Sequence, residues 1–249
     1  MTVKDKILQG RTYLGIELGS TRIKAVLIDD SFSVIASGSK QWENRFENGC
    51  WTYSLDDIHG GIQACYKDLA ENVKAQYGIY PETYGAMGIS AMMHGYMAFD
   101  KNDKLLVPFR TWRNTMTAQA AGELTKLLGF NIPQRWSIAH LYQAVLNKEA
   151  HVPYIAYINT LAGYVHKRLT DRFEVGVGEA SGIFPVEGIG YKKEYCEPTE
   201  KSLAEKGFDH KLKDILPAVR NAGEKGAVLT EEGAKFLDPE GHLKAGVPV

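Results

Sequence analysis

The chain has 249 residues, 44% of them hydrophobic and 24% charged, and its 29 basic and 30 acidic side chains give a formal net charge of −1. This composition is typical of a globular protein and argues against disorder and against charge-driven binding to nucleic acid or membranes. No apolar run reaches the ~18 residues that cross a bilayer, and three scattered cysteines fit a reducing compartment. We therefore expect a cytoplasmic protein with no nucleic-acid or membrane partner.

The N-terminal segment predicts three consecutive antiparallel strands. Two apolar runs within residues 13–29 flank the short polar turn Gly19-Ser20-Thr21, which is a β-hairpin pattern, and residues 34–42 predict the third strand. Glu17 stands just ahead of the turn. Amides and hydroxyls of such a turn can surround a phosphate, and a carboxylate beside them can hold a hydrated Mg²⁺. The alternative is an ordinary hairpin with a solvated acid.

A long helix is predicted after these strands. Ser54, with Asp57 three residues later, forms a short-acid version of a capping box. Apolar residues then recur at spacings of three and four as far as Val73, and Gly78 predicts the end of the helix.

Strand and helix patterns alternate in the remainder of the chain. Short strands are predicted at 84–90 and 95–99, helices at 115–128, 136–147 and 158–169, and weaker helices at 199–206 and 231–236. A glycine-rich segment, 176–190, interrupts them. This order predicts an α/β fold with a mixed sheet flanked by helices, and it differs from the strand–helix alternation of a dinucleotide-binding fold.

Two stretches carry side chains suited to a sugar or polyol. His94 follows a predicted strand, where α/β folds place ligands, and its ring can hydrogen-bond a hydroxyl. The segment Trp112-Arg113-Asn114 combines a flat apolar face with donors and an amide. The alternatives are a histidine satisfied by local backbone and a tryptophan that anchors a loop.

A third stretch presents a single carboxylate. Glu179 lies among small residues and glycines between Gly176 and Gly182, so that a backbone can come close to a ligand there. A positioned carboxylate can accept a proton from an attacking hydroxyl. The alternative is a flexible surface loop.

Together and in this order, these stretches resemble the FGGY carbohydrate kinases, in particular the xylulokinase-like members. The matching segments are Glu17-Leu18-Gly19-Ser20-Thr21 with Lys24, similar to the first phosphate loop; Met93-His94-Gly95, similar to Met-His-Gly; Trp112-Arg113-Asn114, at the place of Trp-x-Asp; Arg168-Leu169-Thr170, similar to the helix end Arg-Leu-Thr-Gly; and Glu179-Ala180-Ser181-Gly182, similar to Asp-Ala-Ser-Gly.

The resemblance implies the ribonuclease H-like fold of the sugar kinase, actin and Hsp70 superfamily. It implies an ATP-dependent kinase that transfers the γ-phosphoryl group of ATP to a hydroxyl of a ketose or polyol. The implied site consists of Glu179 as catalytic base, Glu17 for Mg²⁺, Gly19, Ser20, Thr21 and Lys24 for the phosphates of ATP, and Met93, His94, Trp112, Arg113 and Asn114 for the sugar.

The resemblance also implies a division of labour between two domains. Residues 1–249 match the N-terminal, sugar-binding domain, whereas the C-terminal, ATP-binding domain is absent from this chain and is its expected partner in the full-length protein. We therefore expect this chain alone to bind ATP poorly and to phosphorylate nothing. A homodimer is also possible, and the sequence does not decide the oligomeric state.

Three residues depart from the family pattern. Glu17 and Glu179 stand where the family has aspartates, and Asn114 replaces the sugar-binding acid, which leaves the sugar unassigned. The two glutamates motivate an alternative function, a non-catalytic sugar-binding or regulatory member of the fold. An actin- or Hsp70-like ATPase that binds protein is a further alternative, which His94 and Trp112 argue against.

Overall fold

A four-stranded mixed sheet forms the centre of the computed structural model, which describes residues 1–224 and 226–249. Its order is β3-β2-β1-β6, with the bounds β1 Thr12–Leu18, β2 Arg22–Asp29, β3 Val34–Gln41 and β6 Ala86–Ala91. Strands β1, β2 and β3 are antiparallel neighbours, and β6 runs parallel to β1. The predicted antiparallel strands, hairpin turn and mixed sheet are confirmed.

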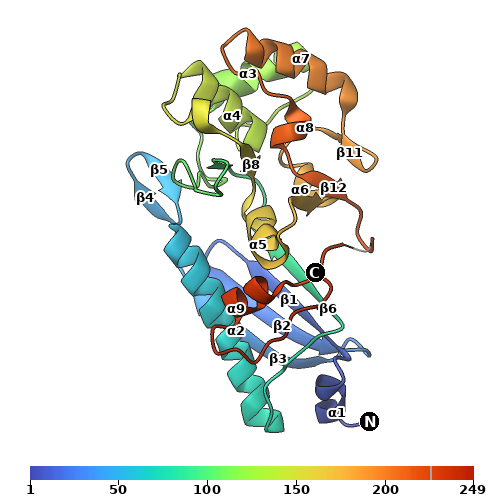
Figure 1. Cartoon of the computed structure of the whole chain (residues 1–249). Coiled ribbons are helices and arrows are strands. Elements are labelled where there is room, and N and C mark those ends of the chain that lie inside the picture. The colour runs from blue at the N-terminus through green and yellow to red at the C-terminus, as the bar shows by residue number, and fades with distance from the viewer. Residues whose placement is uncertain (225) are drawn as a thin grey trace.

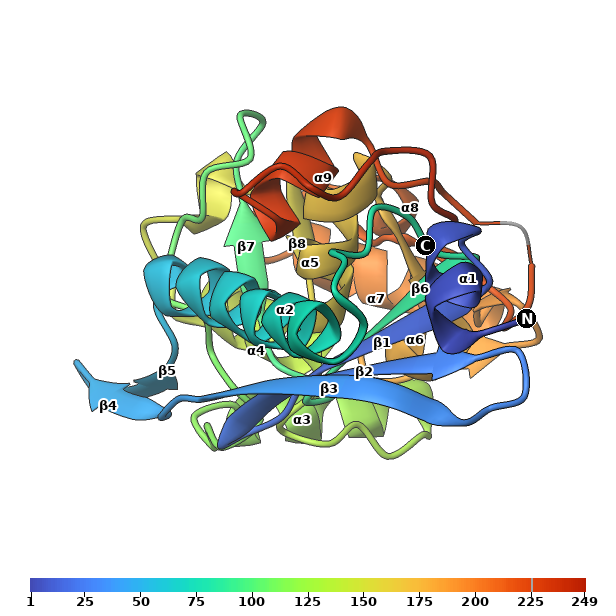
Figure 2. The ribbon, with the colours of Figure 1, turned by 90° about the horizontal axis from the view of Figure 1, so that it is seen from below.

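The long helix α2 (Leu55–Tyr77) covers one face of this sheet (Figure 2). Alternate residues of β1 are buried, because successive side chains of a strand point to opposite faces. The predicted capping box is present: the Ser54 hydroxyl accepts from the Asp57 amide at 3.0 Å, and the Asp57 carboxylate accepts from the Ser54 amide at 3.2 Å. Gly78 ends the helix at a φ of 74°, so the predicted end is also confirmed.

Ser54→Ala is expected to lower the free energy of unfolding by about 1 kcal/mol, because two amides at the start of α2 lose their partners or their alignment. Thermal or urea unfolding measures the loss. Ser31→Ala, at an exposed serine in the turn between β2 and β3, is the matched control and should leave stability nearly unchanged. Equal stability of the two variants would contradict a role for the cap.

Two further helices lie on the same side of the sheet as α2, namely α5 (Leu161–Thr170) and α9 (Glu231–Leu237), and they pack against each other (Figure 2). Beyond the sheet, at the top of Figure 1, lie α3 (Ala118–Leu128), α4 (Ser137–Leu146), α7 (Lys193–Ala204) and α8 (Leu212–Ile215). Their buried side chains belong to a second hydrophobic cluster, which also includes Ala98 and Ile158.

The remaining elements are short. They are α1 Val3–Leu8, the hairpin β4 Arg45–Glu47 with β5 Cys50–Thr52, the pair β7 Met97–Phe99 with β8 Tyr157–Asn159, the 3₁₀ helix Val152–Tyr154, the parallel pair β9 Glu174–Gly176 with β12 Ala218–Arg220, α6 Val177–Ala180, and the hairpin β10 Val186–Glu187 with β11 Gly190–Tyr191.

Three expectations for local structure were wrong. Ile158 is buried in β8 opposite Ala98, so the helix predicted from 158 begins only at Leu161. Helix α7 begins at Lys193, earlier than expected. The glycine-rich segment 176–190, expected to interrupt regular structure, holds α6 and the β10–β11 hairpin. For Ile158, the pairing with the distant strand β7 overrides the local helical pattern.

None of the helices in residues 1–224 and 226–249 is long and apolar enough to cross a membrane.

Candidate functional site

The structure brings the four candidate stretches into contact near the ends of β1 and β6, but of the predicted site residues only Glu179 lines the cleft described below. Glu17 and Ser90 are opposite each other in these parallel strands, and the Met92 amide donates to the Leu18 carbonyl at 2.9 Å. The Trp112 indole lies 3.3 Å from the Ser20 hydroxyl. The stretch around Glu179 reaches the same place through Gly182, which packs against the His94 ring.

Two aromatic side chains hold the turn between β1 and β2 from behind. The Trp42 indole donates to the Gly19 carbonyl at 2.7 Å, and the Tyr53 hydroxyl donates to the Ser20 carbonyl at 2.5 Å. The two rings stack with centroids 4.2 Å apart. In the described part of the chain, the amides of Ser20 and Thr21 donate to no other residue. The turn is therefore rigid, with amides available to an anion.

Glu17 and Lys24 face each other across the hairpin. Their charged atoms are 3.7 Å apart, and both side chains are 56% exposed. No group of three histidine, cysteine or acidic side chains gathers in residues 1–224 and 226–249 as a metal site. A single exposed carboxylate fits a Mg²⁺ ion that keeps most of its water and shares a phosphate ligand, rather than an ion enclosed by protein.

His94 has an unusual backbone conformation and a partly buried ring. Its φ is 71°, in the left-handed region that non-glycine residues rarely adopt. Burial, with a smaller contribution from Arg135, lowers the pKa of His94 below its ordinary value, so the ring is neutral at pH 7. Its Nδ1 atom is buried against the Gly182 backbone, which opposes the pKa shift, and forms no hydrogen bond of regular geometry with the described residues. A neutral imidazole can donate to or accept from a hydroxyl.

The His94 ring packs against Gly182, whose lack of a side chain leaves room for it. A Cβ atom added there would lie 2.5 Å from Nδ1 of His94 and 3.2 Å from Cε of Met93. Only glycine therefore permits this arrangement, which couples the His94 segment to the segment that carries Glu179. The amide of Gly182 donates to the Glu179 carbonyl at 3.0 Å.

The segment 112–114 divides into one outward-facing and two supporting side chains. Trp112 is 42% exposed. The Arg113 guanidinium lies 3.7 Å above the Trp51 ring. Asn114 is buried, accepts from the Trp51 amide at 2.9 Å, and donates to the carbonyls of Trp51 and Thr111 at 2.8 and 3.0 Å. The side-chain amide of Asn114 is thus hydrogen-bonded to the backbone of Trp51 in β5 and of Thr111. Contact of this side chain with a sugar stays a prediction.

Glu179 lies in the wall of a cleft of about 650 Å³. Its Oε1 atom is buried and has no hydrogen-bond partner in the described residues. Burial raises the pKa of Glu179 to about 7, although the hydroxyl of Thr160 opposes the shift. A carboxyl group with this pKa can exchange a proton near neutral pH, as a general base must.

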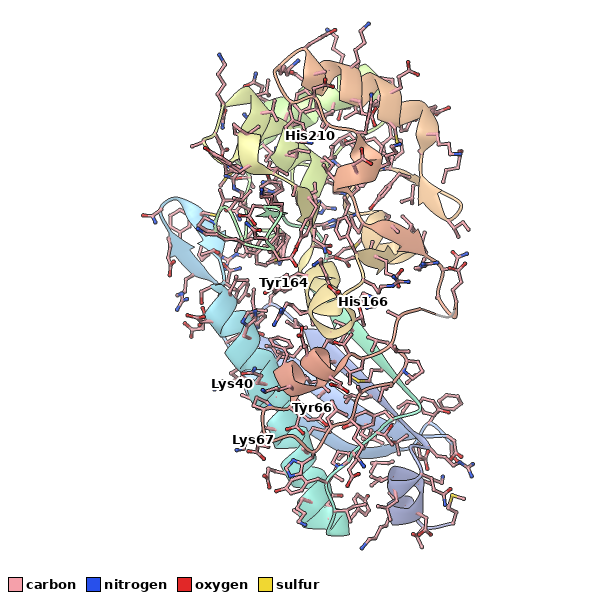
Figure 3. The ribbon with its side chains drawn as sticks, in the orientation of Figure 1. Lys40, Tyr66, Lys67, Tyr164, His166 and His210 are labelled. Atoms are coloured by element: carbon pink, nitrogen blue, oxygen red, sulfur yellow. The ribbon has the colours of Figure 1, made fainter. Side chains whose placement is uncertain are left out.

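Other walls of the cleft come from β6, α5, β12 and the last residues, including Val249. The Pro248 carbonyl accepts from the Met87 amide of β6 at 2.7 Å. Two α5 side chains lie on different sides of their helix (Figure 3). The Tyr164 hydroxyl is hydrogen-bonded to Nε2 of His59 in α2 at 2.6 Å, whereas His166 lines the cleft.

Sequence reasoning missed the residues that support the site rather than form it. Trp42 and Tyr53 fasten the turn, and Arg220 lines the cleft, where its Nε donates to Glu174 at 2.9 Å. These residues come from separate segments and form no motif with the residues they support. No local signal in the sequence could have identified them.

The protein relatives of this chain are sugar kinases. It is 25% identical over 239 residues to a xylulose kinase of Haemophilus influenzae, and this alignment covers 90% of this chain and 47% of that protein. It is also 25% identical over 116 residues to a xylulose kinase of Bacillus subtilis, covering 47% of this chain and 23% of that protein. The chain thus spans about half, or less, of the length of these relatives.

Solved structures of similar fold include three kinases. A xylulose kinase from Rhodospirillum rubrum has a TM-score of 0.76 at 18% identity, covering 96% of this chain and 48% of that one. A gluconate kinase from Lactobacillus acidophilus has a TM-score of 0.74 at 19% identity, covering 95% and 46%. A Plasmodium falciparum glycerol kinase with ADP has a TM-score of 0.71 at 14% identity, covering 96% and 47%.

At these identities the structural likeness shows the fold, and the ribonuclease H-like fold implied by the sequence is confirmed. Residues 12–249 also match the sequence profile described as the FGGY family of carbohydrate kinases, N-terminal domain. The match covers nearly the whole chain, and with it the turn after β1, the His94 segment and Glu179. The chain therefore belongs to the FGGY family of carbohydrate kinases.

Proposed function

We propose that this chain is the sugar-binding half of an ATP-dependent kinase that phosphorylates a hydroxyl of a ketose or polyol. The observation that carries the proposal is the carboxyl group of Glu179, which has a buried, unpartnered oxygen and a pKa of about 7 in the wall of the cleft. A surface loop, the alternative for this segment, would have left the carboxylate solvated and its pKa near the ordinary value.

In the proposed mechanism, Glu179 takes the proton of the attacking sugar hydroxyl as the sugar oxygen bonds to the γ-phosphorus, while the bond from that phosphorus to the oxygen of the leaving ADP breaks. ATP with Mg²⁺ supplies the γ-phosphoryl group when bound. The amides of Ser20 and Thr21 would hold the phosphates, Lys24 would balance their charge, and Glu17 would hold the hydrated Mg²⁺. Positioning and charge stabilisation of this kind account for most catalysis of phosphoryl transfer.

The other end of the site is proposed to bind the sugar. His94 hydrogen-bonds a hydroxyl through its neutral ring, and the exposed face of Trp112 covers the C–H groups of the carbon chain. Met93, 36% exposed beside Gly182, adds apolar contact. Arg113 and Asn114 then act by holding the Trp112 loop to β5.

The C-terminal nucleotide-binding domain of the full-length protein is the proposed partner that completes the cleft. The cytoplasm is the proposed location of the reaction, because ATP is available there. The homodimer and the weak binding of ATP by this chain alone remain predictions.

The test is an assay of the full-length gene product with ATP and Mg²⁺ against a panel of pentuloses, hexuloses and polyols. Sugar-dependent release of ADP supports the kinase. Sugar binding without phosphorylation of any compound would support the non-catalytic alternative raised by Glu17 and Glu179. Hydrolysis of ATP that no sugar accelerates would contradict both.

Gly182→Ala is expected to weaken binding of the preferred sugar by about 10-fold or more, because the new methyl group displaces the His94 ring. Gly122→Ala is the matched control, because Gly122 of α3 is not among the residues that line the cleft and a Cβ atom added there meets no atom within 4 Å. Calorimetric titration of both variants measures the effect. Unchanged affinity in Gly182→Ala would remove His94 from the proposed site.

A further inference from the structure

A buried ion pair lies next to the proposed sugar site, and neither of its two residues is among the predicted site residues. Arg110 immediately precedes Thr111 and Trp112, and Glu149 follows α4, 39 residues further along the chain. The Arg110 guanidinium donates to both carboxylate oxygens of Glu149, in one case at 3.2 Å. The side chains are only 10% and 23% exposed. Such a bidentate pair fixes the direction as well as the distance of its partners.

Arg110 also joins the two sugar-site segments directly. Its amide donates to the Tyr96 carbonyl at 3.1 Å, and the Tyr96 amide donates to the Arg110 carbonyl at 2.8 Å. The guanidinium lies 5.4 Å from the centre of the Tyr96 ring. Because Tyr96 is two residues after His94 and Arg110 two residues before Trp112, this bridge sets the spacing between the His94 ring and the Trp112 loop.

The network extends to His151. The Tyr96 hydroxyl and Nε2 of His151 are 2.9 Å apart, and Nδ1 of His151 is 3.5 Å from Glu149. Burial raises the pKa of Tyr96 and lowers that of His151, so both are neutral at pH 7. In the tautomer with its proton on Nδ1, His151 accepts from the Tyr96 hydroxyl at Nε2 and directs that proton toward the carboxylate. Glu149 is thus held from two sides.

We propose that the Arg110–Glu149 pair is the positioning element of the sugar site, which keeps His94 and Trp112 at the separation that the sugar requires. A buried ion pair contributes little net stability compared with apolar side chains of similar volume, and its best-attested contribution is geometric specificity. The pair therefore affects affinity for the sugar more than it affects folding. This proposal rests on the proposed sugar site.

Two variants test the proposal. Glu149→Gln keeps the shape of the side chain and removes its charge. The double variant Arg110→Met/Glu149→Leu replaces the pair by apolar side chains and remains folded if the single variant fails to fold. The matched control is Glu82→Gln, which removes an exposed partner of Lys244.

Amide hydrogen exchange is the primary measurement, because it requires no ligand. Exchange at Thr111 to Asn114 should become about tenfold faster in both pair variants, with amides of α2 unchanged. In the full-length protein, the KM for the sugar should rise about tenfold while kcat changes little, since Glu179 is not touched. The control should match the unaltered protein in both measurements.

Unchanged exchange at Thr111 to Asn114, or a uniform rise that includes α2, would overturn the proposal, the second because the pair would then serve only the fold. If the unaltered protein binds no sugar of the panel, the proposed function fails, and the exchange comparison still decides whether the pair positions this loop.

Discussion

Glu179→Gln is expected to lower sugar phosphorylation by about 10²- to 10⁴-fold, the range that general acid–base catalysis contributes. The same variant should be more stable than the unaltered protein above pH 7. Loss of activity together with a gain in stability distinguishes a buried catalytic carboxylate from a residue that supports the fold, whose loss would reduce both.

The gain in stability follows from the direction of the pKa shift. In the unfolded chain Glu179 has its ordinary pKa of 4.5, and in the folded protein burial raises it to about 7. Between these values the folded state retains a proton that the unfolded state has lost, so stability falls as pH rises from about 4.5 to about 7. Ionisation of Glu179 in the folded protein thus lowers the free energy of unfolding by on the order of 3 kcal/mol. Glutamine, which does not ionise, removes this loss.

Thermal unfolding at pH 5 and pH 8 measures this effect, and the two proteins should differ mainly at pH 8. The kcat/KM of the unaltered full-length protein should rise with pH through about 7, as Glu179 becomes ionised. Glu187→Gln, at an exposed position of β10, is the control and should change neither property. Wild-type activity in Glu179→Gln would exclude this carboxylate as the base.

Gly38→Ala is expected to destabilise the protein by about 3 kcal/mol or more, at the upper end for overpacked sites. A Cβ atom at this position of β3 would lie 2.4 Å from the Leu69 amide nitrogen and 2.5 Å from the Cys65 carbonyl oxygen of α2. These are backbone atoms, which cannot rotate away, so the whole helix must move from the sheet. A fall in Tm of roughly 6–12 °C follows for a chain of this size.

Gly15→Ala is the matched control for this variant. Gly15 is exposed in β1 of the same sheet, and an added Cβ atom meets nothing within 4 Å. Alanine there should leave stability unchanged or raise it slightly, because glycine in a strand costs conformational entropy. Similar melting temperatures for the two variants would mean that α2 does not depend on this close approach.

The elements predicted well are those whose signals are local. Ser54 and Gly78 mark the two ends of α2 by their own hydrogen bonds and backbone angle, and the Gly19-Ser20-Thr21 turn is flanked by strands that pair with each other. Ile158 shows the limit of this reasoning. Its spacing from Leu161 fits a helix, yet its pairing with β7 places it in a strand.

The candidate site shows the same limit. The resemblance supplied Glu179 and His94 as a base and a sugar ligand, and these remain predictions until variants are measured. It could not supply the supports of the site. Trp42 reaches the turn between β1 and β2 from the end of β3, and Glu149 reaches Arg110 across 39 residues. Such contacts depend on the tertiary fold and leave no spacing in the sequence.

The place of Val249 in the cleft wall has a practical consequence for recombinant protein. In a recombinant protein limited to residues 1–249, an affinity tag fused directly after Val249 would begin inside the cleft that contains Glu179. Met1, which precedes α1, lies at the far end of the sheet (Figure 1). A tag at the N-terminus would leave the cleft open, whereas a small environment-sensitive dye on Val249→Cys would report directly on its occupancy.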